Sequence, residues 1–378
     1  MKAFSGHPAL RGMPAIWLRD SCPCSECRDP HSGQRLFSIT DLSASVAVDS
    51  VTVTGDMVEV VFGPDMHRAV FDAGWLARSA ADCSAAPDER TETAKRLWTA
   101  RQIAPDLPEG NWPRYLINAA HREDCLHALL TDGFVLLRDV PAEPGTVLAV
   151  AGSMGFVRET NYGRLFDVRV EVTPDNLAFT GLSIAPHTDN PYRDPVPTVQ
   201  LLHCLASAAD GGESVLVDGF LAATRLRAED PAGFDLLAGT PVTFAYSDAD
   251  ADLRATRPMI GIDPLGRIRE IRFNNRSLLP VRLPPAQMAG FYAAYRAFAE
   301  LISRPDLMLT FRLSPGDCVV FDNSRILHAR TAFAAAGQRH LQGCYADLDG
   351  VISTLSVLRR ERLSAGSAIP AWKRRPDS

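Results

Sequence analysis

Apolar and polar residues alternate along much of the chain in short runs, which is typical of half-buried β-strands. The clearest example covers residues 43–63, where Gly55 and Asp56 separate two β-branched runs and predict a hairpin. Helix-like polar sequence follows at 88–100, and then a stretch rich in proline, glycine and polar residues. This change of composition predicts a domain boundary near residue 105, with domains over 1–105 and 106–378.

Beyond that boundary, an amphipathic helix is expected to end at Gly133, because glycine is the preferred residue just after a helix. A second clear helix is expected over residues 285–304. The remaining apolar runs predict strands at FVLLRDV, TVQLLHCLA, GESVLVDGF, RIREIRFNN, DLMLTFRL, GDCVVFDNSRILHAR and RHLQGCYADL. Many short strands with few helices favour a sandwich or jelly-roll barrel, mostly β with some α, over a βαβ fold.

Composition narrows the functional classes. The chain has 378 residues, 46% of them hydrophobic, which is enough for two folded domains. Its formal net charge of −6 and the lack of a basic block argue against nucleic acid as a partner. No apolar run is long enough to cross a bilayer, and the N-terminus lacks the apolar segment of a secretory signal. We therefore expect a cytoplasmic protein with no membrane partner.

Three of the eight cysteines, Cys22, Cys24 and Cys27, lie close together near the N-terminus. In a reducing cytoplasm such a trio indicates a metal site more than a disulfide. A structural zinc site takes four Cys and His ligands, and the fourth could be the nearby His31 or the more distant His67. The alternatives are free loop thiols and a nucleic-acid-binding zinc finger, although the second Cys/His pair and the basic residues of such a finger are missing.

A second group of metal-binding residue types lies in the larger domain. His187 and Asp189 are two positions apart in a run of prolines and turn formers, and His328 follows an apolar, strand-like run. Two histidines and one carboxylate on one face are the ligand set of non-heme Fe(II) oxygenases, which leaves three positions on the metal open. Arg339, on the next expected strand, can bind a carboxylate through two parallel hydrogen bonds. This set predicts a site for Fe(II) and 2-oxoglutarate.

The same motifs carry a resemblance to a known family. The chain resembles the gamma-butyrobetaine and trimethyllysine dioxygenases, within the taurine-dioxygenase-like group, over nearly its whole length. The shared motifs are WLRDSCPCSEC, PHTDNPY, VQLLHCL, GGESVLVDGF, FNN, FDNSRILHAR and RHLQGCYADLD. The resemblance implies a small N-terminal α+β domain whose zinc is held by the three cysteines and His67. It also implies a double-stranded β-helix, or jelly-roll, catalytic domain with iron on His187, Asp189 and His328. Arg339 would bind 2-oxoglutarate, and homodimers are implied.

The resemblance also implies a substrate with a trimethylammonium group. Aromatic faces suit this cation because it has no N–H to donate. The matching aromatic positions are Tyr162, Phe166, Phe179 and Tyr345. At the anionic end, Asn190 stands where butyrobetaine hydroxylases tend to have a tyrosine. The remaining polar residues expected to bind the anion are Asn176, Asn274, Asn275 and Arg276.

A pocket with many donors, one fixed positive charge and more space favours a phosphonate over a carboxylate. The chain accordingly resembles most the branch that acts on 2-(trimethylammonio)ethylphosphonate. The expected reaction is hydroxylation at the carbon next to phosphorus, in phosphonate catabolism, with O2 consumed and 2-oxoglutarate converted to succinate and CO2. The alternatives are a gamma-butyrobetaine hydroxylase that makes L-carnitine and a non-catalytic metal-binding barrel.

Overall fold

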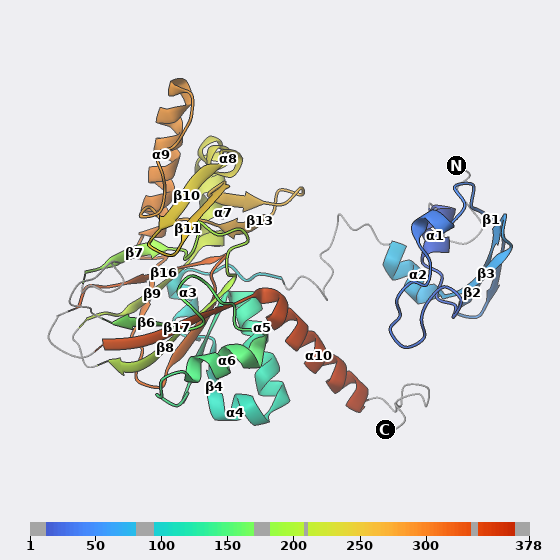
Figure 1. The fold of residues 1–378 in the computed structure, drawn as a ribbon, viewed down its shortest axis with the longest axis horizontal. Coiled ribbons are helices and arrows are strands. Elements are labelled where there is room, and N and C mark those ends of the chain that lie inside the picture. Colours follow the sequence, from blue (N-terminus) through green and yellow to red (C-terminus); the bar gives the residue numbers. More distant parts are fainter. Residues whose placement is uncertain (1–12, 81–93, 170–181, 208–210, 334–338, 367–378) are drawn as a thin grey trace. The chain divides into compact units, whose positions relative to one another are not determined.

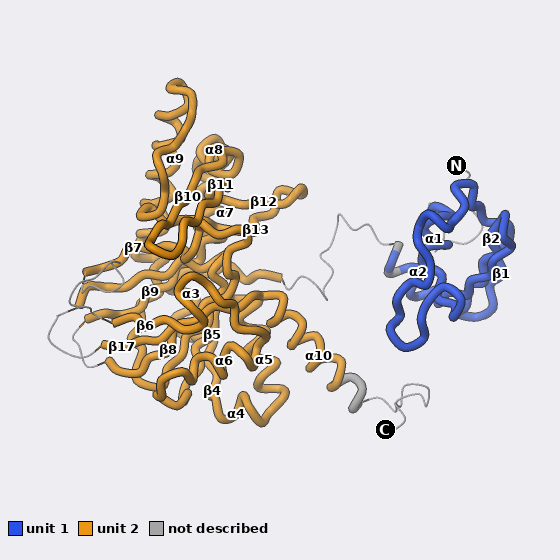
Figure 2. Tube along the Cα trace, viewed as in Figure 1, with its two compact units in different colours: residues 1–87 blue, residues 88–378 orange. Residues whose placement is uncertain are grey.

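The computed structural model describes residues 13–80, 94–169, 182–207, 211–333 and 339–366. The chain forms two compact units, residues 1–87 and 88–378 (Figure 2). Among the described residues, no helix combines the length and apolar character needed to cross a membrane.

The first unit is a small α+β domain built on an antiparallel three-stranded sheet in the order β1-β2-β3. The predicted hairpin is confirmed, because β1 and β2 pair on either side of Gly55, whose φ of 58° suits a tight turn. Val58, Val60 and Phe62 alternate along β2 and bury the face that the helices cover. The elements are α1 (Ala15–Asp20), a 3-10 turn η2 (Ile39–Asp41), β1 (Ala47–Thr54), β2 (Met57–Gly63), β3 (His67–Asp72) and α2 (Ala73–Ala80).

The division between the units falls at Pro87 and Asp88, and not near residue 105. The reason is that Trp98 and Ile103 are buried in the core of the second unit. The helix expected over 88–100 is also wrong for its described part, since residues 94–99 form neither helix nor strand. The backbone there bonds to other elements instead, as when the Trp98 amide donates to the Asp218 carboxylate (3.2 Å).

The second unit is mixed α/β and contains two main sheets (Figure 1). The larger sheet has the order β4-β5-β15-β8-β17-β6, and the smaller sheet has the order β14-β9-β16-β7. Its strands are β4 (Glu109–Asn111), β5 (Phe134–Arg138), β6 (Phe166–Arg169), β7 (Ile184–His187), β8 (Val199–Ser207), β9 (Ser214–Asp218), β14 (Leu309–Phe311), β15 (Cys318–Asp322), β16 (Ile326–Arg330) and β17 (Arg339–Ala346). From β6 to β9 and again from β14 to β17, successive strands alternate between the two sheets.

Helices cover the outer face of the larger sheet, and their apolar side chains share one core with it. They are α4 (Trp112–Ile117), α5 (Ala119–Asp132), α6 (Thr146–Met154) and α10 (Leu348–Gly366). Helix α5 ends at Gly133 as predicted, with a φ of 86°. The short helix α3 (Ala100–Ile103) precedes β4 and packs near β14.

The larger sheet is buried on both faces, so its strands are apolar at consecutive positions. In β5, Val135 and Leu137 face the helices, whereas Phe134 and Leu136 face the core between the two sheets. A one-residue slip would exchange these two sets, so the burial pattern fixes the register.

A third core covers the smaller sheet and includes Val215, Val217 and Leu327 from its strands. It is built by the chain between β9 and β14, which includes the helix predicted over 285–304 and two helices that the sequence pattern did not predict. These elements are α7 (Gly219–Glu229), α8 (Pro231–Gly239), β10 (Val242–Ser247), β11 (Asp252–Arg257), β12 (Ile260–Ile262), β13 (Ile268–Ile271) and α9 (Pro285–Ile302).

One buried ion pair ties the two main sheets to the segment that enters the unit. Arg325 is fully buried; its Nη2 lies 2.8 Å from Asp218 Oδ2, and it also donates to the Thr131 and Arg96 carbonyls.

Breaking a buried pair leaves an uncompensated charge, so Arg325→Met should lower the local stability of the second unit by about 3–5 kcal/mol. Hydrogen exchange of the β5 and β15 amides measures this. The control is Arg296→Met, which breaks only an exposed pair with Glu300 and should leave this exchange nearly unchanged; equal effects would contradict the prediction.

Candidate functional site

A cavity of about 520 Å³ lies in the second unit, lined by both main sheets and by β10. It brings together most of the residues predicted from the sequence: Tyr162, Phe166, His187, Asp189, Asn190, Asn274, Arg276, His328, Arg339 and Tyr345. Asn176 and Phe179 lie outside the described residues. Asn275 is exposed and is not among the lining residues, so the structure does not support its predicted role.

His187 and His328 are direct partners across the antiparallel pair β7 and β16. Their ring centroids are 4.2 Å apart. Asp189 follows β7, and its Oδ1 lies 3.3 Å from His187 Nε2 and 3.9 Å from His328 Nε2. One ligand atom from each of the three residues thus lies within 4.8 Å of the others, a spacing that one metal ion can bridge.

The protonation states also suit a metal. Burial, with the neighbouring His187 as the second cause, lowers the pKa of His328 to about 3, so this ring is neutral. Burial acts to raise the pKa of Asp189, but the two histidines and the Tyr345 hydroxyl outweigh it and hold that pKa well below its usual range. His187 donates from Nδ1 to the Ala185 carbonyl (3.0 Å), which leaves Nε2 as the available lone pair. Neutral imidazole and ionised carboxylate are the forms that bind metals.

The backbone around Asp189 is held by a residue that sequence reasoning missed. The Asn323 side chain accepts from the Asp189 amide (2.8 Å) and donates to the Asp189 carbonyl (3.0 Å). Asn323 is 1% exposed and lies between β15 and β16, close in sequence to His328. One side chain therefore couples the HxD loop to the turn that precedes the distal histidine.

The cavity lining is rich in cationic groups. Arg276, Arg330 and Arg339 line it, whereas Asp189 is its one carboxylate among the described residues. Arg339 begins β17, and its Nη1 is buried with no hydrogen-bond partner in the described part of the chain. Partial burial lowers the pKa of Arg339, as desolvation does for any cation. A buried guanidinium N–H group without a partner is costly to a fold, so Nη1 fits an anionic ligand such as a carboxylate.

Aromatic rings form a continuous wall of the cavity. Phe166 lies 5.2 Å from Tyr345 and 6.1 Å from Tyr162 between ring centroids. Gly343 makes room for Phe166, because a Cβ at this position would collide with the Phe166 ring. Sequence reasoning missed Tyr192 and Tyr246, which stack on each other with centroids 5.1 Å apart. Tyr246 also meets the Tyr162 ring edge-on (5.7 Å), and both missed residues line the cavity.

The predicted polar residues differ in what they can offer a ligand. Asn190 is 3% exposed, and neither its amide oxygen nor its amide nitrogen has a partner among the described residues. Its φ of 54° is left-handed, which asparagine tolerates better than most residues. The Asn274 amide, by contrast, is engaged by the backbone, donating to the Thr188 carbonyl and accepting from the Arg276 amide. Asn190 and Arg276 are therefore the better placed to bind a ligand.

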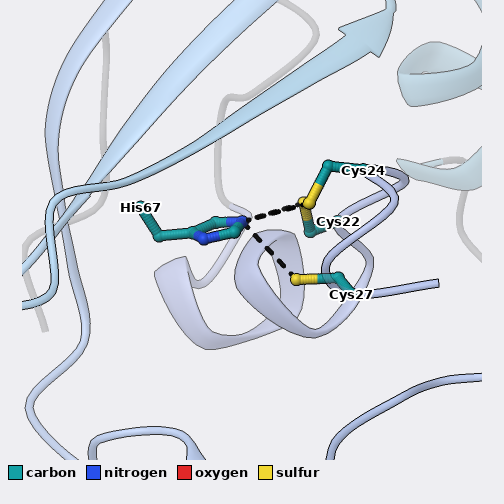
Figure 3. A group of neighbouring side chains, drawn as sticks. All are labelled: Cys22, Cys24, Cys27 and His67. Atoms are coloured by element: carbon teal, nitrogen blue, oxygen red, sulfur yellow. Dashed lines mark hydrogen bonds between the residues drawn. The ribbon is translucent and has the colours of Figure 1, made fainter.

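The first unit contains the predicted cysteine cluster (Figure 3). The Sγ atoms of Cys22, Cys24 and Cys27 lie 3.2, 3.6 and 3.5 Å from Nε2 of His67, the first residue of β3. A tetrahedral zinc ion with its usual bond lengths would place such atoms roughly 3.5 Å apart, so the set fits zinc. His31 is exposed and lies outside the cluster.

A buried arginine lies beside these thiols. Arg19 is 8% exposed, and its Nη1 donates to Cys27 Sγ at 3.2 Å. Three thiolates would give a zinc site a net negative charge, and the guanidinium offsets part of it. Asp65, 3.3 Å from Arg19 Nη2, holds the guanidinium from the other side.

Comparisons with known proteins assign the chain to a family. Residues 99–345 match the model of the taurine catabolism dioxygenase TauD, TfdA family, and residues 9–77 match the gamma-butyrobetaine hydroxylase-like N-terminal model. The chain therefore belongs to the TauD, TfdA dioxygenase family and carries the N-terminal domain of gamma-butyrobetaine hydroxylase-like proteins. It is an Fe(II)- and 2-oxoglutarate-dependent dioxygenase.

Its relatives are similar over nearly their whole length. A gamma-butyrobetaine dioxygenase of Pseudomonas sp. (strain AK-1) is 38% identical over 91% of this chain and 90% of its own. The human gamma-butyrobetaine dioxygenase is 32% identical over 92% and 91%. A trimethyllysine dioxygenase of Meyerozyma guilliermondii is 29% identical over 94% and 92%.

We predict that the freshly purified protein contains one zinc per chain and that stripping it with a chelator unfolds the first unit, because such sites contribute their binding energy to folding. Cys22→Ser should lose the zinc. Cys125→Ser, which alters a buried thiol of the second unit, should keep it. Elemental analysis gives the stoichiometry. Full zinc in Cys22→Ser, or none in the wild type, would show that the cluster is not a zinc site.

Proposed function

We propose that this dioxygenase hydroxylates a small trimethylammonium anion and that gamma-butyrobetaine is its preferred substrate, with L-carnitine as the product. The relative that is 38% identical, a gamma-butyrobetaine dioxygenase, supports this substrate over the phosphonate expected from the sequence. The observation that carries the proposal is the composition of the cavity. A His–Asp–His group, an aromatic wall and the buried Asn190 amide, which has no partner among the described residues, all line one space.

His187, Asp189 and His328 would hold Fe(II), and Arg339 would bind the distal carboxylate of 2-oxoglutarate. With these bound, O2 is activated to hydroxylate a C–H bond while CO2 and succinate are released. The strand order supports a double-stranded β-helix, since strands from the two halves of the unit alternate in the smaller sheet and, from β5 to β6, in the larger sheet. Homodimerisation stays a prediction, which light scattering of the purified protein would test.

The chain itself would orient the substrate. Tyr162, Phe166 and Tyr345 would contact the trimethylammonium group, whose charge is attracted to ring faces. Asn190 and Arg276 would bind the anion at the other end. Fixing both ends places one carbon beside the metal, which is the positioning that selective hydroxylation requires.

A second substrate is favoured by one observation. The exposed cation Arg276 lines the cavity together with the Asn190 amide, which has no partner among the described residues. A phosphonate, with three oxygens and more charge, could use both groups. 2-(Trimethylammonio)ethylphosphonate is therefore the competitor against which gamma-butyrobetaine should be measured.

Replacing any one of the three proposed iron ligands should abolish turnover. His328→Ala is expected to form no succinate with gamma-butyrobetaine, 2-oxoglutarate and Fe(II) present, because a ligand of the facial triad is lost. His127→Ala, a histidine of α5 outside the cavity, should leave turnover unchanged. Succinate and carnitine are both quantified by mass spectrometry. Wild-type turnover in the His328→Ala protein would refute the assignment of this site.

The anion-binding residues should affect the substrate more than 2-oxoglutarate. Asn190→Gly keeps the left-handed backbone but removes the amide, and Arg276→Ala removes the charge. Each should lower kcat/KM for gamma-butyrobetaine about tenfold or more, because a hydrogen bond to a charged group is worth about 1.5–3 kcal/mol. KM for 2-oxoglutarate should stay unchanged, and Arg282→Ala, exposed and outside the cavity, is the control.

The same variants are assayed with both substrates in competition, and the two hydroxylated products are counted. A wild-type preference for the phosphonate would replace gamma-butyrobetaine as the proposed substrate. If neither Asn190→Gly nor Arg276→Ala changes kcat/KM for either compound, these residues do not bind the anion.

A further inference from the structure

The two oxygens of the Asp189 carboxylate have different surroundings. Oδ1 faces the Nε2 atoms of His187 and His328, at 3.3 and 3.9 Å. Oδ2 accepts two hydrogen bonds instead, one from Gln200 Nε2 (2.8 Å) and one from the Tyr345 hydroxyl (2.9 Å). One oxygen of the carboxylate thus faces the two histidines, whereas the other accepts hydrogen bonds from Gln200 and Tyr345.

The two donors are placed by the register of the larger sheet. Gln200 on β8 and Tyr345 on β17 are direct cross-strand partners, and both line the cavity. They are 1% and 3% exposed, so the hydrogen bonds are shielded from water. Asp189 belongs to the loop after β7, a strand of the smaller sheet. Gln200 and Tyr345, both on the larger sheet, therefore donate across the space between the sheets to a single oxygen, Oδ2 of Asp189.

We propose that Gln200 and Tyr345 are positioning residues that restrict Asp189 to binding the metal through Oδ1 alone. The inference rests on the proposed iron site. A facial triad contributes three protein atoms and leaves three positions for 2-oxoglutarate and O2. A carboxylate that turned to bind through both oxygens would take one of these positions. Two donors on Oδ2 oppose this rotation and also satisfy an oxygen that burial has removed from water.

The hydroxyl and the ring of Tyr345 have different contacts and therefore different proposed roles. The ring packs against Phe166 in the aromatic wall, whereas the hydroxyl points to the carboxylate. Tyr345→Phe therefore removes the donor and keeps an aromatic face for the substrate. Gln200→Leu removes the second donor with a side chain of similar size.

The test is Fe(II) binding to the full-length, zinc-loaded protein without oxygen, 2-oxoglutarate or substrate. Bound iron is measured by equilibrium dialysis and elemental analysis, which distinguishes iron from zinc. Tyr345→Phe and Gln200→Leu should each weaken Fe(II) binding about tenfold or more, the usual effect of losing a partner that orients a metal ligand. The ligand-field spectrum of the bound Fe(II), recorded by magnetic circular dichroism, should also change in both variants.

Tyr115→Phe is the matched control, since it removes another buried hydroxyl, one bonded to Ser153 in the helical layer. It should leave both the affinity and the spectrum as in the wild type. Wild-type affinity and spectrum in Tyr345→Phe and Gln200→Leu would overturn the proposal. Asp189→Ala identifies which claim has failed. If it too binds Fe(II) normally, the iron site is wrong; if it alone loses iron, only the positioning pair is wrong.

Discussion

The antiparallel pairing of β7 with β16 is the constraint on which the rest of the site depends. It sets His187 directly opposite His328, so the two nitrogens of one metal site are held by the hydrogen bonds of a sheet. Asn323 then fixes the backbone of Asp189, and the Gln200–Tyr345 pair fixes its carboxylate. The His187–His328 and Gln200–Tyr345 pairs follow from strand register, so a one-residue slip between β7 and β16 or between β8 and β17 would separate these side chains.

The charge of the cavity lining is consistent with two ligands that each carry an anionic group, as proposed. Among the described residues, three arginines and one carboxylate line it, and the carboxylate contacts the two histidines and the two donors. Nη1 of Arg339 is buried without a partner among the described residues, whereas Arg276 is exposed and flanks Asn274. The buried cation fits a co-substrate that must be held in one orientation. The more accessible one would meet the anionic end of the substrate that is hydroxylated.

The sequence predicted those parts whose chemistry dictates the residue type. Metal ligands must be His, Asp or Cys, and His187, Asp189, His328 and the Cys22–Cys24–Cys27–His67 group are brought together as expected. It could not predict Gln200, Asn323, Tyr192 or Tyr246, because these are ordinary strand and loop residues whose contacts arise from register and packing. Asn275, by contrast, was predicted to bind the anion but is exposed and outside the cavity lining, although its neighbours Asn274 and Arg276 line the cavity. The composition of residues 94–99 predicted a helix. Instead, Trp98 is buried and its backbone amide donates to the Asp218 side chain and not within a helix.

If the site is as proposed, one iron ion binds where the two sheets meet, and the Asp189 carboxylate engages it through a single oxygen. Crystals of the zinc-loaded protein, soaked without oxygen in Fe(II) and 2-oxoglutarate and measured at the iron absorption edge, decide this. We expect one strong iron peak bonded to Nε2 of His187, Nε2 of His328 and Oδ1 of Asp189, with Oδ2 still hydrogen-bonded to Gln200 and Tyr345. An iron peak elsewhere in the chain, or one bonded to both oxygens of Asp189, would rule this arrangement out.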